Sequence, residues 1–222
     1  MRMRRKKHLD EKIAKCSNLI LTPPITSDYR EEVKNKEYID FNEIFGSSKP
    51  LVMEIGCGKG KFICELAKRE PDKNFIAVEV NPNVLCSACE LAETEGVNNV
   101  IYIKCGAEVL TKYIKPHSIE RIYLNFSCPF PKKAYENRRL TNIRFLEIYK
   151  EILSASGDIH QKTDNMGFFE YSLEQYSLAG FRLKNVSLDL HNSNFENNIV
   201  TEYEKKFSEL GFRIYRLEAF PN

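Results

Sequence analysis

Residues 51–62 read LVMEIGCGKGKF, and this stretch decides the fold. Its first five residues form a short apolar run that is typical of a buried strand. Gly56, Gly58 and Gly60 follow at alternate positions, where they let the backbone turn sharply and approach a ligand closely. A helix that begins after them would point its unpaired N–H groups at that ligand. The stretch therefore predicts a strand, a ligand-binding loop and a helix, with a purely structural tight turn as the alternative.

The alternation of strand and helix continues along the chain. Apolar runs predict further strands at 74–80, 99–105, 121–126 and 157–163. Helical segments are expected to end near Arg69 and to span 83–95, 141–153 and 166–179. The late strands, expected at 181–190 and 212–219, are separated by only a short helix at 202–210, which favours an antiparallel pairing at one edge. We therefore predict an α/β fold with a doubly wound, mostly parallel sheet.

The composition fits one globular domain with an N-terminal extension. The chain has 222 residues, 42% of them hydrophobic, and a formal net charge of only +2. Its first eight residues, MRMRRKKH, nevertheless carry five Lys or Arg and no acid. Such a run is either a solvated end or an arm that binds nucleic acid. We expect a basic arm and linker over 1–48, with a short helix near 10–19, and one folded domain over 49–222.

Several classes of protein are disfavoured. No apolar stretch approaches the roughly 20 residues of a membrane span, and no signal-peptide core follows the basic start, so we expect a cytoplasmic protein without membrane attachment. The seven cysteines show no spacing typical of a disulfide framework. Cys86 and Cys89 form a C-x-x-C without two further zinc ligands at suitable spacing. We therefore expect them to pack within a helix, and we expect no metal site.

Two acids flank the glycine loop. Glu54 lies two residues before the first glycine, where a carboxylate would repel a pyrophosphate but attract a cation. Glu79 closes the second predicted strand, where its two oxygens could bind both hydroxyls of a ribose. The spacing G-x-G-x-G also differs from the G-x-G-x-x-G of dinucleotide enzymes. A nucleoside with a cationic amino-acid tail fits these features, and S-adenosylmethionine is such a molecule.

The stretch NFSCPFPKK, residues 125–133, closes the fourth predicted strand beside the same crevice. Phe130 lies between two prolines, which would fix the direction of a ring that could stack on a base. Cations that could bind phosphates follow at Lys132, Lys133, Arg138 and Arg139. The alternative is a rigid loop with a solvated basic face.

At this point the sequence resembles the bacterial tRNA (guanine-N7-)-methyltransferases, class I enzymes that methylate the guanine at position 46 of tRNA. The matching segments extend over nearly the whole chain: MRMR, EIGCGKGKF, NFSCPFPKK with RRLT, HQKTDN, VSLDLHNSN, TEYEKKF and GFRIYRLEA. The resemblance implies a seven-stranded sheet with the last strand inserted antiparallel. It also implies a methyltransferase domain over 49–222, S-adenosylmethionine as methyl donor, and tRNA as partner of a monomer or homodimer.

The resemblance further implies roles for individual residues. Glu54 and Glu79 match the acids that bind the cofactor, together with the three glycines of the loop. Lys132 matches a substrate-binding lysine, and Asp164 matches a carboxylate near the target guanine, with a catalytic role. The segment that approaches the guanine is matched by Thr201, Glu202, Tyr203 and Glu204. Read from the residues alone, Thr201 and Glu204 also make a capping box at the start of a helix.

The chain departs from the family pattern at three positions. Cys128 stands where the family usually has the Asp that is named catalytic and that lies beside the cofactor. Phe130 stands where it usually has Trp. Gly106 follows the third predicted strand, where the family often holds the adenine with Asp or Asn.

Two other functions stay open on these residues. The chain could be another nucleic-acid methyltransferase, acting on an exocyclic amine or, with Cys128 as nucleophile, on a pyrimidine carbon. It could also be an RNA-binding relative without catalytic activity.

Overall fold

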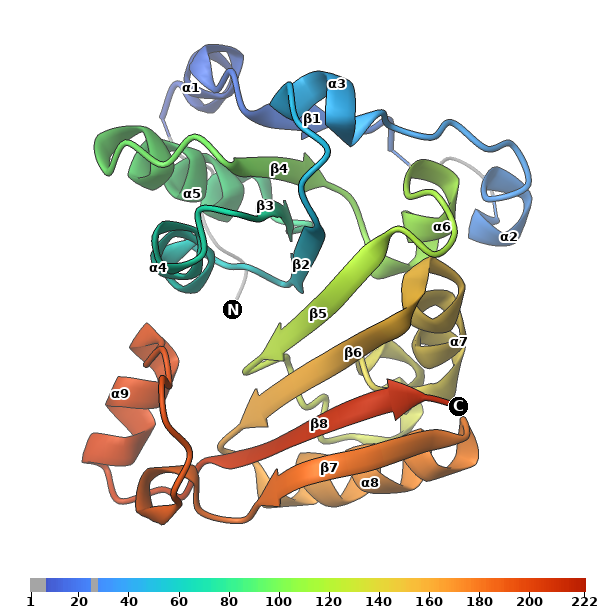
Figure 1. Cartoon of the computed structure of the whole chain (residues 1–222), viewed down its shortest axis with the longest axis vertical. Coiled ribbons are helices and arrows are strands. Elements are labelled where there is room, and N and C mark those ends of the chain that lie inside the picture. Colours follow the sequence, from blue (N-terminus) through green and yellow to red (C-terminus); the bar gives the residue numbers. More distant parts are fainter. Residues whose placement is uncertain (1–6, 25–27) are drawn as a thin grey trace.

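The computed structural model describes residues 7–24 and 28–222, which form one eight-stranded sheet between two layers of helices (Figure 1). The strands lie in the order β1-β4-β3-β2-β5-β6-β8-β7. Their bounds are β1 (Leu19–Leu21), β2 (Leu51–Ile55), β3 (Asn74–Val78), β4 (Val100–Lys104), β5 (Ile119–Asn125), β6 (Leu153–Thr163), β7 (Phe181–Ser187) and β8 (Tyr215–Pro221). The α-helices are α1 (Leu9–Lys15), α2 (Tyr29–Glu32), α3 (Phe41–Phe45), α4 (Lys61–Arg69), α5 (Pro82–Thr94), α6 (Leu110–Tyr113), α7 (Ile143–Ile152), α8 (Met166–Leu178) and α9 (Glu202–Glu209). Short 3-10 helices are η1 (Ala107–Val109), η2 (Lys133–Arg138) and η3 (Leu190–Asn192).

The predicted doubly wound, mostly parallel sheet is confirmed. Neighbouring strands from β1 to β6 pair in parallel, and β8 alone runs against its neighbours. It lies between β6 and β7, with Ala219 opposite Ile159 on one side and Leu183 on the other. The expected antiparallel insertion of the last strand is therefore present.

The number of strands differs from the expected seven because β1 comes from the segment predicted as arm and linker. Ile20 pairs with Ile103 of β4, and the hydroxyl of Thr22 donates to the Lys104 carbonyl at 2.7 Å. Three residues are too few for a periodic pattern, so only the partner strand defines this element. The expected helix near 10–19 is present as α1, whereas residues 1–6 of the basic run lie outside the described residues.

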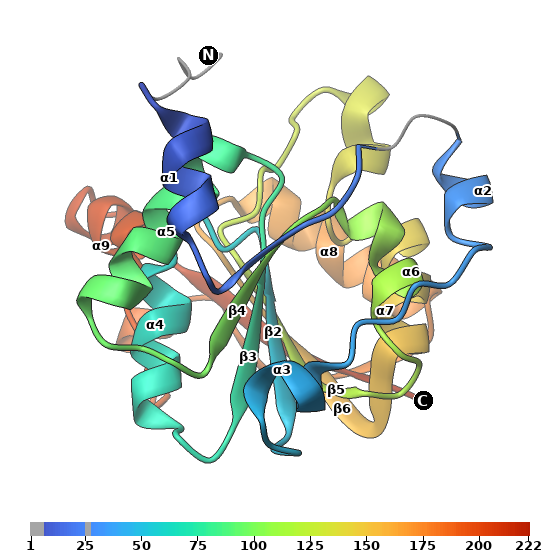
Figure 2. The same cartoon turned by 90° about the horizontal axis from the view of Figure 1, so that it is seen from above.

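Helices cover both faces of the sheet, which is seen edge-on in Figure 2. Alternate residues of each strand point to opposite faces. Val52 of β2 belongs to a core cluster that includes Phe62 of α4 and Leu85 of α5. The next residue, Met53, belongs to the cluster on the opposite face, which includes Phe145 and other buried residues of α6, α7 and α8. Cys86 and Cys89 are buried in α5, as expected.

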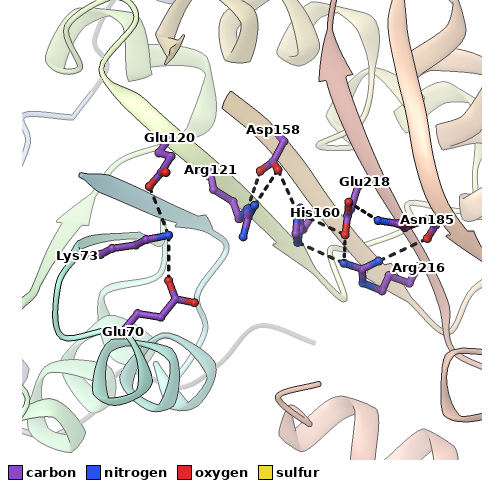
Figure 3. Close-up of polar contacts among 9 residues, drawn as sticks. All are labelled: Glu70, Lys73, Glu120, Arg121, Asp158, His160, Asn185, Arg216 and Glu218. Carbon is purple, nitrogen blue, oxygen red and sulfur yellow. Dashed lines mark hydrogen bonds and ion pairs between the residues drawn. The ribbon is translucent and has the colours of Figure 1, made fainter. Parts of the chain in front are cut away.

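Beyond α4, the same face of β5, β6 and β8 carries a row of charged side chains (Figure 3). Arg121 binds both oxygens of Asp158 at 2.6 and 2.9 Å, and Asp158 contacts His160 at 3.3 Å. The row continues to Glu218 and Arg216 of β8. Asp158, His160 and Lys162 lie two residues apart along β6 and therefore point to the same face of the sheet.

Two features are absent from residues 7–24 and 28–222. No helix there is long and apolar enough to cross a membrane. No group of three or more His, Cys, Asp or Glu side chains there is placed to hold a metal ion.

Candidate active site

A cavity of about 730 Å³ lies where β2, β3, β4 and β5 end. The carboxyl ends of parallel strands meet at one edge of a sheet, and ligands of such folds bind there. Among the predicted site residues, the cavity is lined by Glu54, Gly56, Gly58, Glu79, Gly106, Cys128, Thr201, Glu202 and Tyr203. Gly60, Lys132, Asp164 and Glu204 do not line it. The structure thus brings the predicted cofactor acids and the predicted substrate segment to one space.

The glycine loop has the backbone that its sequence predicts. Gly56, Gly58 and Gly60 have φ of 80°, 56° and 80°, a region that L side chains rarely adopt. A Cβ on Gly60 would lie 2.8 Å from the Cβ of Ala88, so this glycine lets α4 approach α5. A Cβ on Gly58 would meet nothing within 4 Å. Gly58 therefore opens onto the cavity, whereas Gly60 serves the packing behind it.

Glu54 is buried at the floor of the cavity. Its Oε1 accepts a hydrogen bond from Asn125 Nδ2 at 2.9 Å, while its Oε2 is buried without a hydrogen-bond partner. Burial raises the pKa of Glu54 to about 7 and the charge of Glu79 adds to this, although the Asn125 hydrogen bond and the charge of Lys162 lower it. A buried carboxylate oxygen without a partner is costly. The ammonium of an amino-acid tail in the cavity would supply the missing donor, so this site fits S-adenosylmethionine.

Glu79 joins the glycine loop to the end of β3. Its Oε1 accepts from the N–H groups of Val80 and Asn81 at 2.8 and 2.9 Å, and its Oε2 accepts from Gly58 N at a longer 3.3 Å. The Oε2 atom therefore keeps acceptor capacity toward the cavity. This geometry suits the ribose hydroxyls of a nucleoside.

Gly106 leaves room for a carboxylate that the sequence analysis missed. A Cβ on Gly106 would lie 2.4 Å from Oε2 of Glu108, so the Glu108 side chain covers the position that a side chain of residue 106 would take. Both residues line the cavity, together with Val80 and Val84. Glu108 thus places an acceptor close to the position where the family pattern has Asp or Asn.

The turn after β5 faces the cavity from the other side. Phe130 lines the cavity with φ of 41°, and Arg139 binds the carbonyls of Pro129 and Phe130 at 2.9 and 3.1 Å. The Arg138 guanidinium lies 4.7 Å from the centroid of the Phe130 ring. Arg139 therefore fixes the turn rather than extending freely for a phosphate, and Arg138 covers part of the ring.

The same turn brings polar atoms without partners to the cavity. Ser127 Oγ and Asn125 Oδ1 are buried without a hydrogen-bond partner, and both residues line the cavity. The Cys128 thiol is exposed and lines it too. Each of these groups could bind a ligand that enters the cavity, and the sequence pattern pointed only to Cys128.

Lys132, Asp164 and Glu204 are not among the residues that line the cavity. Lys132 is exposed just beyond the turn, and Asp164 follows β6 directly. The hydroxyl of Thr201 accepts from Glu204 N at 3.0 Å and so caps α9. Only this half of the expected capping box forms, because the Glu204 carboxylate binds Lys162, His191 and Asn198 instead of the N–H of Thr201. Glu204 is fully buried, with its Oε2 2.6 Å from the ammonium of Lys162.

Comparison with known proteins agrees with this architecture. Residues 48–217 match the model of a family described as "Putative methyltransferase". The 16S rRNA methyltransferase KamB superimposes with a TM-score of 0.60 at 14% identity, over 84% of this chain and 96% of that one. The fold is therefore that of the doubly wound methyltransferases.

Curated relatives narrow the assignment. The tRNA (guanine-N(7)-)-methyltransferase of Geobacillus sp. (strain WCH70) is 48% identical over 219 residues, which cover 99% of this chain and 95% of that protein. The protein of the same name from Bacillus subtilis (strain 168) is 44% identical, over 99% and 98% of the two chains. The chain belongs to the tRNA (guanine-N7-)-methyltransferase family.

Proposed function

We propose that this chain transfers a methyl group from S-adenosylmethionine to N7 of the guanine at position 46 in the variable loop of tRNA. One observation carries the proposal: the unpartnered oxygen of Glu54 and the ring of Phe130 line a single cavity, in a chain 48% identical to a named tRNA (guanine-N(7)-)-methyltransferase. The first fits the cationic tail of the donor, and the second fits a base.

The chemistry asks more for alignment than for proton transfer. Guanine N7 carries an in-plane lone pair and no proton at neutral pH, so its attack on a methyl group needs no general base. S-adenosylmethionine, when bound, supplies that methyl on a positively charged sulfur. Glu54 and Glu79 hold the donor, and the turn at Phe130 orients the base, so that the two reacting atoms meet in line.

Charge moves from sulfur to the purine as the methyl passes. A carboxylate near the purine would stabilise this shift, and Asp164 at the end of β6 is our candidate. Lys132 lies exposed beside the turn, where it can bind a phosphate of the entering strand. Thr201, Glu202 and Tyr203 line the same cavity, and we assign them to contact with the guanine.

The experiment uses the purified protein, labelled S-adenosylmethionine and an unmodified tRNA transcript, followed by mapping of the labelled atom. The expected product is N7-methylguanine in the variable loop. A second transcript, in which the variable-loop guanine is replaced, should accept no label. Transfer to that second transcript would refute the assignment of position 46.

The same mapping separates the other two functions. Label on a pyrimidine carbon would make Cys128, whose thiol lines the cavity, the candidate nucleophile. Binding of both ligands without transfer would indicate an RNA-binding relative without activity. The oligomeric state and the cytoplasmic location stay predictions from the sequence.

A further inference from the structure

The start of α9 forms one side of the cavity, although little regular structure holds it there. Thr201, Glu202 and Tyr203 line the cavity, and Tyr203 is 63% exposed. Residues 193–201, which lead into the helix, belong to no helix or strand. In Figure 1, α9 lies below α4, near the carboxyl ends of β5 and β6. Some other contact must therefore fix this segment.

That contact is a buried cluster around Glu204. Its Oε2 accepts from Lys162 Nζ at 2.6 Å, and its Oε1 is bound by His191 Nε2 at 3.0 Å and by the amide of Asn198. The Lys162 ammonium also donates to Asn198 Oδ1 at 3.1 Å and to the Ile199 carbonyl at 2.8 Å. One lysine of β6 thus binds both the helix and the loop that precedes it.

Both charged groups are nearly inaccessible to solvent. The Lys162 side chain is 7% exposed and the Glu204 side chain 0% exposed. With three acceptors around the ammonium and donors on both carboxylate oxygens, the hydrogen bonds of the pair are satisfied within the protein. A guanine could bind the Glu204 carboxylate directly only by displacing Lys162, His191 or Asn198, and removing a partner from a buried ion pair is costly.

We propose that Lys162 is a positioning residue, and that its ion pair with Glu204 holds residues 198–203 against the cavity so that they are placed for the guanine before tRNA arrives. That the segment is placed for a guanine rests on the proposed function. The role assigned to Glu204 thereby changes from contact with the substrate to support of the residues that make it. A buried ion pair suits this task because it is demanding in geometry even where it adds little net stability.

The cluster around Glu204 also lies close to the part of the cavity that we assign to S-adenosylmethionine. The Lys162 ammonium is 5.5 Å from the centroid of the Phe62 ring in α4, and Phe62 lines the cavity. Arg216 of β8 stands opposite Lys162 in the sheet, at the end of the charged row of Figure 3. Lys162 therefore connects the central strands, the donor site and the α9 segment.

The primary test is Glu204→Gln, which keeps the size of the side chain and the backbone N–H capped by Thr201. We expect KM for tRNA to rise at least tenfold and the Kd of S-adenosylmethionine to stay within about twofold. Backbone hydrogen exchange of residues 195–203 should accelerate in the protein without tRNA. The matched control is Lys205→Met, which removes a lysine from the same helix that is 71% exposed and only 3.9 Å from Glu209; it should change none of these values.

Direct contact between Glu204 and the guanine predicts a different result, in which kcat falls while exchange without tRNA is unchanged. That outcome would overturn the proposal. Lys162→Met combined with Glu204→Gln should accelerate exchange of 195–203 by less than the sum of the two single variants, since both disrupt the same ion pair, and fully additive effects would count against the proposal. If Glu204→Gln does not fold, Asn198→Ala weakens the same cluster and should give the same pattern. Absence of methyl transfer by the wild type would refute the proposed function, whereas the exchange experiment would still decide whether the ion pair holds the segment.

Discussion

At the scale of single residues, Glu54 is the group whose ionisation matters most for the donor. Burial raises the pKa of Glu54 to about 7, so at neutral pH the carboxyl is close to half protonated. Only the ionised form attracts an ammonium. S-adenosylmethionine should therefore bind to the ionised form of Glu54. The molecules in which Glu54 is protonated should release that proton on binding.

We expect the affinity for S-adenosylmethionine to increase about fivefold from pH 6 to pH 7, following the ionised fraction of a group with a pKa of about 7. Calorimetric titration in two buffers of different ionisation enthalpy measures both the affinity and the proton release. Glu54→Gln should weaken binding and remove this pH dependence. A flat wild-type affinity between pH 6 and pH 7, together with an unchanged affinity in Glu54→Gln, would show that Glu54 does not pair with the ligand.

Cys128 stands at the position where the resemblance led us to expect an Asp. We expect Cys128→Ser to keep methyl transfer within about tenfold of the wild type, which corresponds to about 1.4 kcal/mol of barrier. Attack by N7 needs neither a base nor a covalent intermediate, and serine keeps the size and a hydrogen-bonding group. Single-turnover rates between about pH 6 and 9 provide the measurement, with Cys128→Asp as comparison. A collapse in the serine variant together with recovery in the aspartate variant would mean that the thiol supplies a negative charge.

At the scale of elements, the turn that carries Phe130 depends on a side chain from the end of η2. Arg139 binds two consecutive carbonyls of the turn, and its guanidinium lies 4.2 Å from the centroid of the Tyr171 ring in α8. The direction of the Phe130 ring is thus set by the two prolines beside it and by the pair of hydrogen bonds that Arg139 donates.

Arg139→Lys keeps the charge but not the planar fork, so the turn should lose its fixed direction. We expect kcat/KM for tRNA to fall about tenfold while the affinity for S-adenosylmethionine stays unchanged. Arg138→Lys is the matched control, because Arg138 lies on the Phe130 ring without binding the carbonyls of the turn, and it should cost less than about twofold. Equal losses in both variants would indicate that the two arginines act only as cations on the RNA.

The elements that the sequence predicts well are those with local patterns. The segments β2, α4, β3 and α5 follow from apolar runs, glycines and caps that lie within a few residues of each other. β1 could not be found in this way, because a three-residue strand has no period and exists only through pairing with β4.

The residues of the candidate site also divide into those that a local sequence pattern predicts and those that it does not. Glu54 and Glu79 are readable from their places at strand ends. Asn125, Glu108 and Lys162 were missed because their roles depend on partners far along the chain or on the missing side chain of Gly106. The alternation of Asp158, His160 and Lys162 was a usable signal, since polar residues at every second position mark one face of a strand.

At the scale of the whole molecule, the charged row connects the parallel strands β5 and β6 with the antiparallel strand β8. Burial alone would raise the pKa of Asp158, but hydrogen bonds from His160 and Arg121 and their charges lower it to about 2. A carboxyl whose folded pKa is depressed stabilises the protein above its unfolded pKa of 3.8, and this contribution is lost as the pH falls from about 4 toward 2.

We expect Arg121→Met to lower the free energy of unfolding by about 2 kcal/mol at pH 7, because Asp158 would lose two charge-assisted hydrogen bonds. Urea unfolding at pH 7 and at pH 3 measures the effect, which should shrink at the lower pH. The control is Lys34→Met, which breaks a contact of similar length with Glu31 in which both side chains are more than 60% exposed. A midpoint shift equal to that of the control would show that the row does not stabilise the sheet.

The position of β8 between β6 and β7 has a consequence for how the chain is made. β7 emerges from the ribosome before its only neighbour in the described sheet, since Phe181–Ser187 pair with Tyr215–Pro221 and with no earlier strand. Until β8 has been synthesised, β6 presents an open edge and β7 has nowhere to dock. Such edges are prone to aggregation. The segment between β7 and β8, whose residues 201–203 line the cavity, is translated within this interval, so this side of the cavity is made before the sheet has its last strand.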